Sequence, residues 1–148
     1  MLFRSIIFEE MYVDACAMNL IRQPEQFDVI VTTNLFGDIL SDESSQVVGG
    51  LGMAPAANLG DDFALFEPVH GAAFDIAGQN IANPSSFLLS IKMMLDWLGV
   101  KHNDPTCFEV ATKLESTIFD LVKSGIKTKD IGGDKTTIEF TKQITDHL

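Results

Sequence analysis

Basic side chains, cysteines and long apolar runs are all scarce in this sequence. Ten Lys and Arg stand against 21 Asp and Glu in 148 residues, for a net charge of −11. This balance argues against nucleic acid and anionic membrane surfaces as partners, because both would repel a strongly acidic protein. The two cysteines, Cys16 and Cys107, lie far apart and in no metal-ligand spacing. We therefore expect free, partly buried thiols and neither a disulfide framework nor a zinc site.

Targeting and phosphate-binding signals are also missing. The opening MLFRSIIF is followed at once by Glu9 and Glu10, which makes it too short for a secretory leader. The most apolar later stretch, SFLLSIKMMLDWLG, is interrupted by Lys92 and Asp96 and is too short to span a membrane. No GxGxxG or GxxxxGK[ST] loop occurs. With 46% hydrophobic and 21% charged residues, the sequence predicts a folded cytoplasmic protein.

Apolar periodicity and Pro/Gly positions predict an α/β fold. Helices are expected at 14–23, 37–48, 84–98 and 105–123 and from 136 to the end, strands at 27–33 and 64–68, and a glycine-rich loop at 49–55. The run 27–33, FDVIVTT, is continuous and β-branched, which is typical of a strand covered on both faces. So few strands are unusual for a self-sufficient doubly wound sheet, and we expect further strands to lie outside this sequence.

The apolar positions of the expected helices predict which side chains form the core. The predicted buried positions are Ile39, Leu40, Val47 and Val48 in the second helix, Phe87, Ile91, Met94 and Leu98 in the third, and Phe108, Ala111, Leu114, Ile118 and Leu121 in the fourth.

Two aspartates stand four residues apart in NLFGDILSDESS. On a helix, Asp38 and Asp42 would share one face. Two like charges at one place suit a hard divalent cation such as Mg²⁺ or Mn²⁺, which prefers oxygen ligands. The alternative is that Asp38 favours the positive end of a helix and Asp42 simply faces solvent.

The segment EPVHGAAFDIAGQNIANP, residues 67–84, combines polar side chains with small residues. It places Glu67, His70, Asp75 and Asn83 in a loop that a flat ligand could approach closely. A carboxylate there suits the two hydroxyls of a nucleotide ribose and repels a 2′-phosphate. The alternative is a structural loop with a helix-capping Asp and a hydrogen-bonded His.

Two long motifs give the sequence a family resemblance. The run from YVDACAMNLIRQ through GLGMAPAANLG and the run FALFEPVHGAAFDIAGQNIANPSSFLLSIKMMLDWLG resemble the carboxy-terminal half of the β-decarboxylating dehydrogenases. This family includes 3-isopropylmalate, isocitrate, homoisocitrate and tartrate dehydrogenases. DESSQVVGGLGMAPAANLG together with GAAFDIAG most resembles archaeal-type 3-isopropylmalate dehydrogenases. The resemblance implies the carboxy-terminal portion of the family's three-layer α/β fold.

The resemblance assigns the aspartates and a dimer. Asp14, Asp38 and Asp42 match the family ligands of the catalytic Mg²⁺ or Mn²⁺. Family active sites are shared across a homodimer, so Asp14 would reach the metal of the neighbouring subunit. Residues 1–48 would belong to the dimer-forming, metal-binding domain, and residues 49–148 to the nucleotide-side domain.

The resemblance also assigns the second motif. Six positions match the family's dinucleotide site: Glu67, His70, Gly71, Asp75, Ile76 and Asn83. Asp75 followed by Ile76 is similar to members that use NAD, whereas members that use NADP tend to carry a Lys-Tyr pair there. The sequence GAAFD departs from the commoner GSAPD at Ala72 and Phe74.

The implied reaction is NAD-dependent oxidative decarboxylation of a 2-hydroxy acid with a β-carboxylate, such as 3-isopropylmalate, isocitrate or homoisocitrate. No residue matches the lysine and tyrosine that transfer protons in the family, or its substrate-binding arginine cluster. We therefore expect an incomplete chain that turns over no substrate by itself. The alternative is a non-catalytic regulatory subunit or dimerising remnant, although regulatory subunits often lose metal aspartates and all three are kept here.

Overall fold

A computed structural model describes residues 6–148, so the first five residues of the MLFRSIIF segment lie outside the described part. The chain divides into two compact units, Met1–Val47 and Val48–Leu148. The division falls one residue before the boundary expected at 48. The assignment of these parts to a dimer-forming and a nucleotide-side domain stays a prediction.

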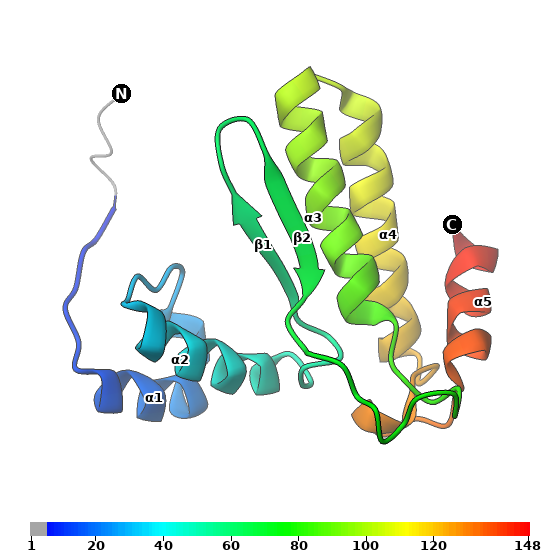
Figure 1. Cartoon of the computed structure of the whole chain (residues 1–148), viewed down its shortest axis with the longest axis horizontal. Coiled ribbons are helices and arrows are strands. Elements are labelled where there is room, and N and C mark those ends of the chain that lie inside the picture. Colours follow the sequence, from blue (N-terminus) through cyan, green and yellow to red (C-terminus); the bar gives the residue numbers. More distant parts are fainter. Residues whose placement is uncertain (1–5) are drawn as a thin grey trace. The chain divides into compact units, whose positions relative to one another are not determined.

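The first unit consists of two α-helices joined through a short 3₁₀ turn. Its elements are α1 (Val13–Arg22), η1 (Pro24–Gln26) and α2 (Asn34–Val47) (Figure 1). Helix α1 carries an acidic residue in its first turn and a basic one in its last, which suits the helix dipole. The chain turns away at Pro24, as the sequence predicts.

A small core joins α1 to α2. Cys16, Leu20 and Leu40 are buried in it. Of the four positions expected to line the buried face of the second helix, only Leu40 is buried, while Ile39, Val47 and Val48 are each at least half exposed. The expected start at Gly37 is also wrong, because α2 begins at Asn34.

The strand expected at 27–33 is not formed. The segment has no strand assignment, and Val29 and Val31 are 81% and 91% exposed. A strand is held by ladder hydrogen bonds to a neighbouring strand. Among the described residues of the first unit there is no other strand to supply them, so the β-branched run forms no strand, and all of it except Phe27 is exposed.

The second unit consists of an antiparallel hairpin and three α-helices, of which α3 packs on the hairpin. Its elements are β1 (Pro55–Leu59), β2 (Ala64–Pro68), α3 (Ser85–His102), α4 (Pro105–Lys123), η2 (Lys129–Ile131) and α5 (Thr137–His147). In the hairpin register, Ala57 pairs with Phe66. Strand β1 is an addition to the expected elements, because PAANL carries no β-branched signal. The strand expected at 64–68 is confirmed.

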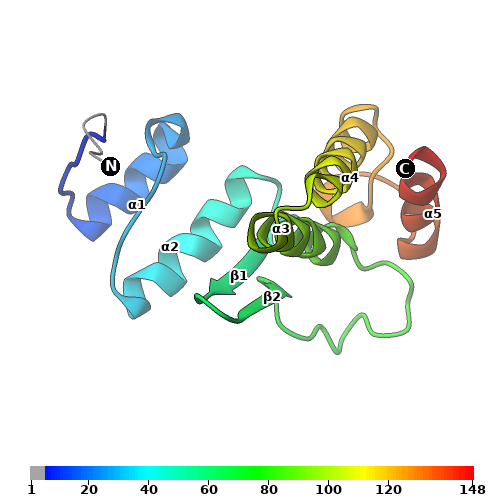
Figure 2. The same ribbon diagram turned by 90° about the horizontal axis from the view of Figure 1, so that it is seen from above.

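Helix α3 lies against the hairpin on one side and against α4 on the other (Figures 1 and 2). Its hairpin side is polar and small: Ser86 Oγ donates to Ala54 O at 2.5 Å, and Ser90 Oγ donates to Glu67 O at 2.7 Å. On the α4 side, a Cβ on Gly99 would lie 2.9 Å from the Phe108 ring. A glycine there allows the two helices to approach closely.

The ends of α4 and α5 show why these segments are helical. Asp104 caps α4 by accepting from Thr106 N at 2.9 Å, and Pro105 occupies the first turn. Thr136 and Glu139 form a reciprocal capping box at the start of α5. The helices expected at 105–123 and at the end of the chain are confirmed, and α3 continues four residues beyond its expected end at 98.

The core of the second unit lies where α3, α4 and α5 meet. Its buried members are Met53, Leu89, Leu114, Ile118, Leu121, Phe140 and Ile144. Phe87 and Phe108 were predicted to be buried but are 56% and 39% exposed, and the predicted Ile91, Met94 and Leu98 are only half-buried. The predicted Ala111, Leu114, Ile118 and Leu121 are buried. No helix within residues 6–148 combines the length and the hydropathy needed to cross a bilayer.

Candidate functional site

The predicted nucleotide segment forms the connection from β2 to α3. Figure 2 shows it as a wide loop that leaves the hairpin and returns to the start of α3. Glu67 lies on β2 with its carboxylate exposed and 3.5 Å from Asn58 Nδ2. Its backbone carbonyl accepts the Ser90 hydroxyl. The first predicted residue of the site is therefore fixed by its main chain, while its side chain stays accessible.

His70 and Gly71 follow directly after β2. The His70 side chain is exposed, and its Nδ1 lies 3.0 Å from the carbonyl oxygen of Gly71. A Cβ placed on Gly71 would meet no atom within 4 Å. The protein itself therefore does not require a glycine here, and the open space beside the backbone is available to a ligand.

The middle of the loop is a turn that presents Asp75. Ile76 N donates to Ala73 O at 3.3 Å, which closes a turn with Phe74 and Asp75 at its centre. Gln79 Nε2 donates to the Asp75 carbonyl at 2.7 Å, so the backbone of the turn is tied while the Asp75 side chain is exposed. Ile76 is half-buried. A ribose hydroxyl could reach the Asp75 carboxylate without displacing protein.

Asn83 differs from the other predicted residues because its side chain points into the protein. It is 9% exposed, and its Nδ2 donates to Asp130 Oδ2 at 3.0 Å. Its Oδ1 accepts from Ser85 N at 2.9 Å, which satisfies a free amide at the start of α3. Asn83 thus fixes the end of the loop, and a direct contact between its side chain and a nucleotide stays a prediction.

Two residues that sequence reasoning did not single out also anchor the loop. Asn80, at φ 59°, accepts from Thr137 N through its carbonyl and from Ile138 N through its side chain. Thr137 Oγ1 in turn donates to Ala82 O at 2.6 Å. The second half of the loop is therefore docked on the start of α5. No side-chain pattern in the sequence indicates this contact.

The predicted metal ligands lie on the helices of the first unit. Asp38 and Asp42 are one turn apart on α2 and both exposed, and Asp38 Oδ2 accepts from Asn34 Nδ2 at 3.3 Å. Asp14 is in the first turn of α1, with Oδ1 2.8 Å from Ala15 N. Within the described part of the chain no group of three or more His, Cys, Asp or Glu side chains could hold a metal ion.

The chemistry of the α2 pair fits a hard cation. Two exposed carboxylates on one helical face supply two oxygen ligands, and Mg²⁺ or Mn²⁺ commonly completes its shell with water and substrate oxygens. Asp14 is predicted to reach the metal of a partner subunit, so a single chain would contribute the α2 pair to one site and Asp14 to the other.

The groups with shifted pKa values are not among the predicted site residues. Partial burial works against the Lys92 ammonium, but hydrogen bonds to Asp96 and Glu115 outweigh it and raise the pKa of Lys92. A hydrogen bond from Lys135 lowers the pKa of Asp134. Desolvation raises the pKa of both thiols, Cys16 and Cys107, and both are free, as predicted. These shifts belong to structural ion pairs and to the two free thiols.

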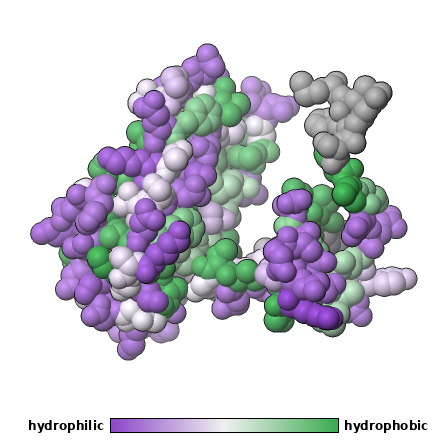
Figure 3. Space-filling model, turned by 180° about the vertical axis from the view of Figure 1, so that it is seen from behind, coloured by the Kyte–Doolittle hydropathy of each residue, from purple (hydrophilic) through white to green (hydrophobic). Residues whose placement is uncertain are grey.

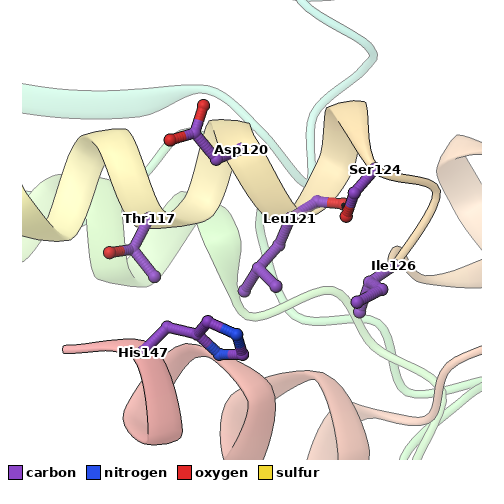
Figure 4. Close-up of a pocket in the computed structure, with 6 residues that line it drawn as sticks. All are labelled: Thr117, Asp120, Leu121, Ser124, Ile126 and His147. Atoms are coloured by element: carbon purple, nitrogen blue, oxygen red, sulfur yellow. Dashed lines mark hydrogen bonds between the residues drawn. The ribbon is translucent and has the colours of Figure 1, made fainter.

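A separate hollow of about 320 Å³ lies between α4 and the end of α5 (Figure 4). It is lined by Thr117, Asp120, Leu121, Ser124, Ile126 and His147. None of the predicted site residues belongs to it. The Ser124 hydroxyl donates a hydrogen bond to the Leu121 carbonyl, and His147 Nδ1 is hydrogen-bonded to the Gln143 carbonyl. Sequence reasoning does not indicate this hollow, and it carries no constellation of reactive groups.

The family model for isocitrate/isopropylmalate dehydrogenase matches residues 2–148. The chain belongs to this family of dehydrogenases.

Curated relatives carry several dehydrogenase names. A 3-isopropylmalate dehydrogenase of Sulfurisphaera tokodaii is 53% identical over 142 residues, which is 95% of this chain and 42% of the relative. An isocitrate/homoisocitrate dehydrogenase of Thermus thermophilus is 50% identical over 146 residues, covering 99% of this chain and 42% of the relative. The chain therefore spans less than half the length of these relatives.

A solved structure confirms the fold class. The crystal structure of isocitrate dehydrogenase from Methylococcus capsulatus matches with a TM-score of 0.88 at 40% identity, covering 98% of this chain and 42% of that one. The predicted fold, the carboxy-terminal portion of an isopropylmalate dehydrogenase-like α/β architecture, is thus correct.

Proposed function

We propose that this chain supplies the metal and nucleotide positions of an NAD-dependent dehydrogenase that oxidatively decarboxylates a 2-hydroxy acid bearing a β-carboxylate. The observation that carries the proposal is the tied turn at 73–76, which presents the Asp75 carboxylate to solvent beside half-buried Ile76. We take 3-isopropylmalate as the substrate, in line with the name of the Sulfurisphaera relative. Isocitrate or homoisocitrate is the second candidate, because the Thermus relative carries those names at nearly the same identity.

Separate residues of this chain would bind the nucleotide and the metal. Asp75 would accept hydrogen bonds from both ribose hydroxyls, and its charge would repel a 2′-phosphate. Ile76 offers no cation to a 2′-phosphate, which favours NAD over NADP. Asp38 and Asp42 would hold Mg²⁺ or Mn²⁺, and the metal supplies Lewis-acid stabilisation of negative charge on substrate oxygen. NAD⁺ supplies the hydride acceptor.

A two-component assay tests the proposal. The 148-residue chain would be co-expressed with the amino-terminal part of the Sulfurisphaera relative that precedes the matched region, and NADH formation measured with each of the three hydroxy acids. We expect no activity from the chain alone, since it has no residue matching the family's proton-transfer lysine and tyrosine. Metal-dependent NADH production by the pair, strongest with 3-isopropylmalate, would support the proposal. Absence of NADH from a correctly assembled pair would favour a non-catalytic regulatory or dimerising chain.

Matched variants separate the metal and nucleotide roles. Asp42→Asn should lower activity of the pair at least about 10- to 100-fold, because even indirect partners of a metal contribute that much. Glu25→Gln, an exposed acidic change in the same unit, should leave activity unchanged. The double change Asp75→Lys with Ile76→Tyr should move the preference from NAD⁺ toward NADP⁺. An unaltered preference would contradict the nucleotide assignment.

We further propose a homodimer whose active sites are shared through Asp14. Asp14→Asn and Asp42→Asn chains, each assembled with the amino-terminal component, should both be impaired alone. After mixing and reassociation, one site per heterodimer would contain both native aspartates, so activity should partly return. No recovery in a proven mixed dimer would show that both aspartates act within one subunit, and an unimpaired Asp14→Asn chain would show that Asp14 has no metal role.

A further inference from the structure

Phe74 is the most exposed aromatic side chain of the nucleotide loop. It is 88% exposed, although a phenylalanine ring exposed to this degree loses the free energy that burial would provide. It stands next to Asp75 at the centre of the turn closed by Ile76 N and Ala73 O. An aromatic ring and a carboxylate are therefore presented together from one tied turn.

The surroundings of the turn leave space for a flat ligand. Gly71 and Gly78 flank it, and a Cβ on either would meet no atom within 4 Å. Ala72 and Ala73 precede Phe74 with small, exposed side chains. Figure 2 shows this part of the chain lying away from the helices of the second unit. The open face of the ring is thus not occupied by the unit's own side chains.

The loop is nevertheless anchored at both ends. At its start, Val69 N donates to Ala54 O at 3.3 Å, and at its end Asn83 is buried and bonded to Asp130. Gln79 ties the Asp75 backbone. Holding the ring in a tied turn lowers the ordering cost of binding, because less of the loop must be immobilised.

We infer that Phe74 is a base-stacking residue, which packs its ring on the adenine of a dinucleotide whose ribose is held by Asp75. The inference rests on the proposed nucleotide function and adds a contact that this chain's GAAFD sequence provides. Every base has a π-face, and stacking on an aromatic side chain adds affinity without a hydrogen bond or a charge. This suits an acidic chain, which cannot attract a dinucleotide by net charge.

Saturation-transfer NMR on the 148-residue chain tests the inference with three probes: NAD⁺, AMP and nicotinamide mononucleotide. We expect saturation of the adenine H2 and H8 protons in NAD⁺ and AMP.

Phe74→Ala should weaken binding of both NAD⁺ and AMP by about 5- to 100-fold, the range for loss of one stacked base. Phe74→Trp should keep or strengthen binding, and Phe74→Leu, which stays apolar, should weaken it. Because the side chain is exposed, none of these changes should lower the unfolding temperature appreciably.

The outcomes separate this inference from the function on which it rests. If NAD⁺ and AMP bind to the native chain and Phe74→Ala binds them equally, stacking is wrong and the nucleotide function stands. If neither probe binds to the folded native chain, both fail. If Phe74→Ala instead changes the sedimentation coefficient and leaves AMP binding intact, the ring covers a contact between copies of the chain and the inference is overturned. The affinity ratio between native and Phe74→Ala chains should also be the same at low and high salt.

Discussion

The side-chain amide of Asn83 donates a hydrogen bond of 3.0 Å to Asp130 Oδ2, across 47 positions of sequence. The other Asp130 oxygen accepts from Thr128 Oγ1 at 2.5 Å. A Cβ on Gly52 would lie 2.7 Å from Asp130 Oδ2, so only a glycine fits without a shift there. Asp130 therefore connects the end of the nucleotide loop to two other loops of the second unit.

Breaking this pair should destabilise the second unit and loosen the nucleotide loop. Asn83→Ala leaves the Ser85 amide and Asp130 without their partner, and we expect a loss of about 1–3 kcal/mol in the free energy of unfolding. Asp130→Ala should cost a similar amount. Because the two changes remove one interaction, their effects should couple by about 0.5–3 kcal/mol in a double-mutant cycle measured by denaturant unfolding.

Asp61→Ala, an exposed change at the hairpin tip, is the matched control and should shift stability by less than about 0.5 kcal/mol. Additive effects of Asn83→Ala and Asp130→Ala would mean that the 3.0 Å contact contributes no coupling in solution.

The periodicity of apolar residues predicted most of the helices of this fold. It predicted wrongly where the burial of a segment depends on contacts with other segments. Helices α1, α4 and α5 agree with prediction because their apolar spacing is local, and α4 and α5 also begin at local side-chain caps. The run 27–33 has strong strand propensity but no neighbour among the described strands, so the pattern alone could not decide its state. Phe87 fell on a predicted apolar stripe, yet α3 turns Ser86 and Ser90 toward the hairpin instead.

The candidate site was predictable only in part for a similar reason. Asp75 and His70 are exposed in the loop, as a ligand-binding reading requires. Asn83 was predicted with them, but its side chain is buried and serves the loop's attachment. A long-range hydrogen bond such as that between Asn83 and Asp130 leaves no periodic signal in the sequence. The same holds for the hydrogen bond between Asn80 and Thr137.

Phe140 should be the most sensitive position of α5. Its side chain is fully buried in the core shared with Ile118 and Leu121. Phe140→Ala should lower the free energy of unfolding of the second unit by about 3–5 kcal/mol, since it removes buried apolar area and leaves a cavity. Ile138→Ala on the same helix is the control, because Ile138 is 69% exposed. Equal effects of the two changes in urea unfolding would show that α5 is not docked on this core.

Glu139 should make the start of α5 sensitive to acid. Hydrogen bonds from the Thr136 backbone and hydroxyl lower the pKa of Glu139, with Lys135 adding to the effect and Asp134 opposing it. A lowered pKa in the folded state means that the stabilisation is present above the ordinary value of 4.5 and is lost as the pH falls through the lowered value. Glu139→Gln keeps an acceptor in the capping box but does not titrate.

The difference in unfolding temperature between native and Glu139→Gln chains should therefore be constant from pH 7 to about 5.5 and shrink as the pH falls to about 3. Glu109→Gln, an exposed carboxylate change on α4, is the control for general charge effects. A Glu139→Gln difference that stays constant down to the lowest pH would show that the capping interaction does not depend on the charge of Glu139.

The exposed run around Val29 and Val31 should limit the solubility of the chain by itself. These side chains are 81% and 91% exposed and flank Ile30, in a segment with high strand propensity and unpaired backbone. Figure 3 shows apolar residues at the surface of each unit, so this run adds to an already uncovered surface. Val29→Lys with Val31→Lys should reduce light scattering at high protein concentration while changing the free energy of unfolding by less than about 0.5 kcal/mol.

Leu40→Lys is the contrasting change, because Leu40 is 4% exposed and an unpaired charge there should unfold the first unit. If the double lysine variant also unfolded the first unit, Val29 and Val31 would be covered in solution, and their run would be part of that unit's core.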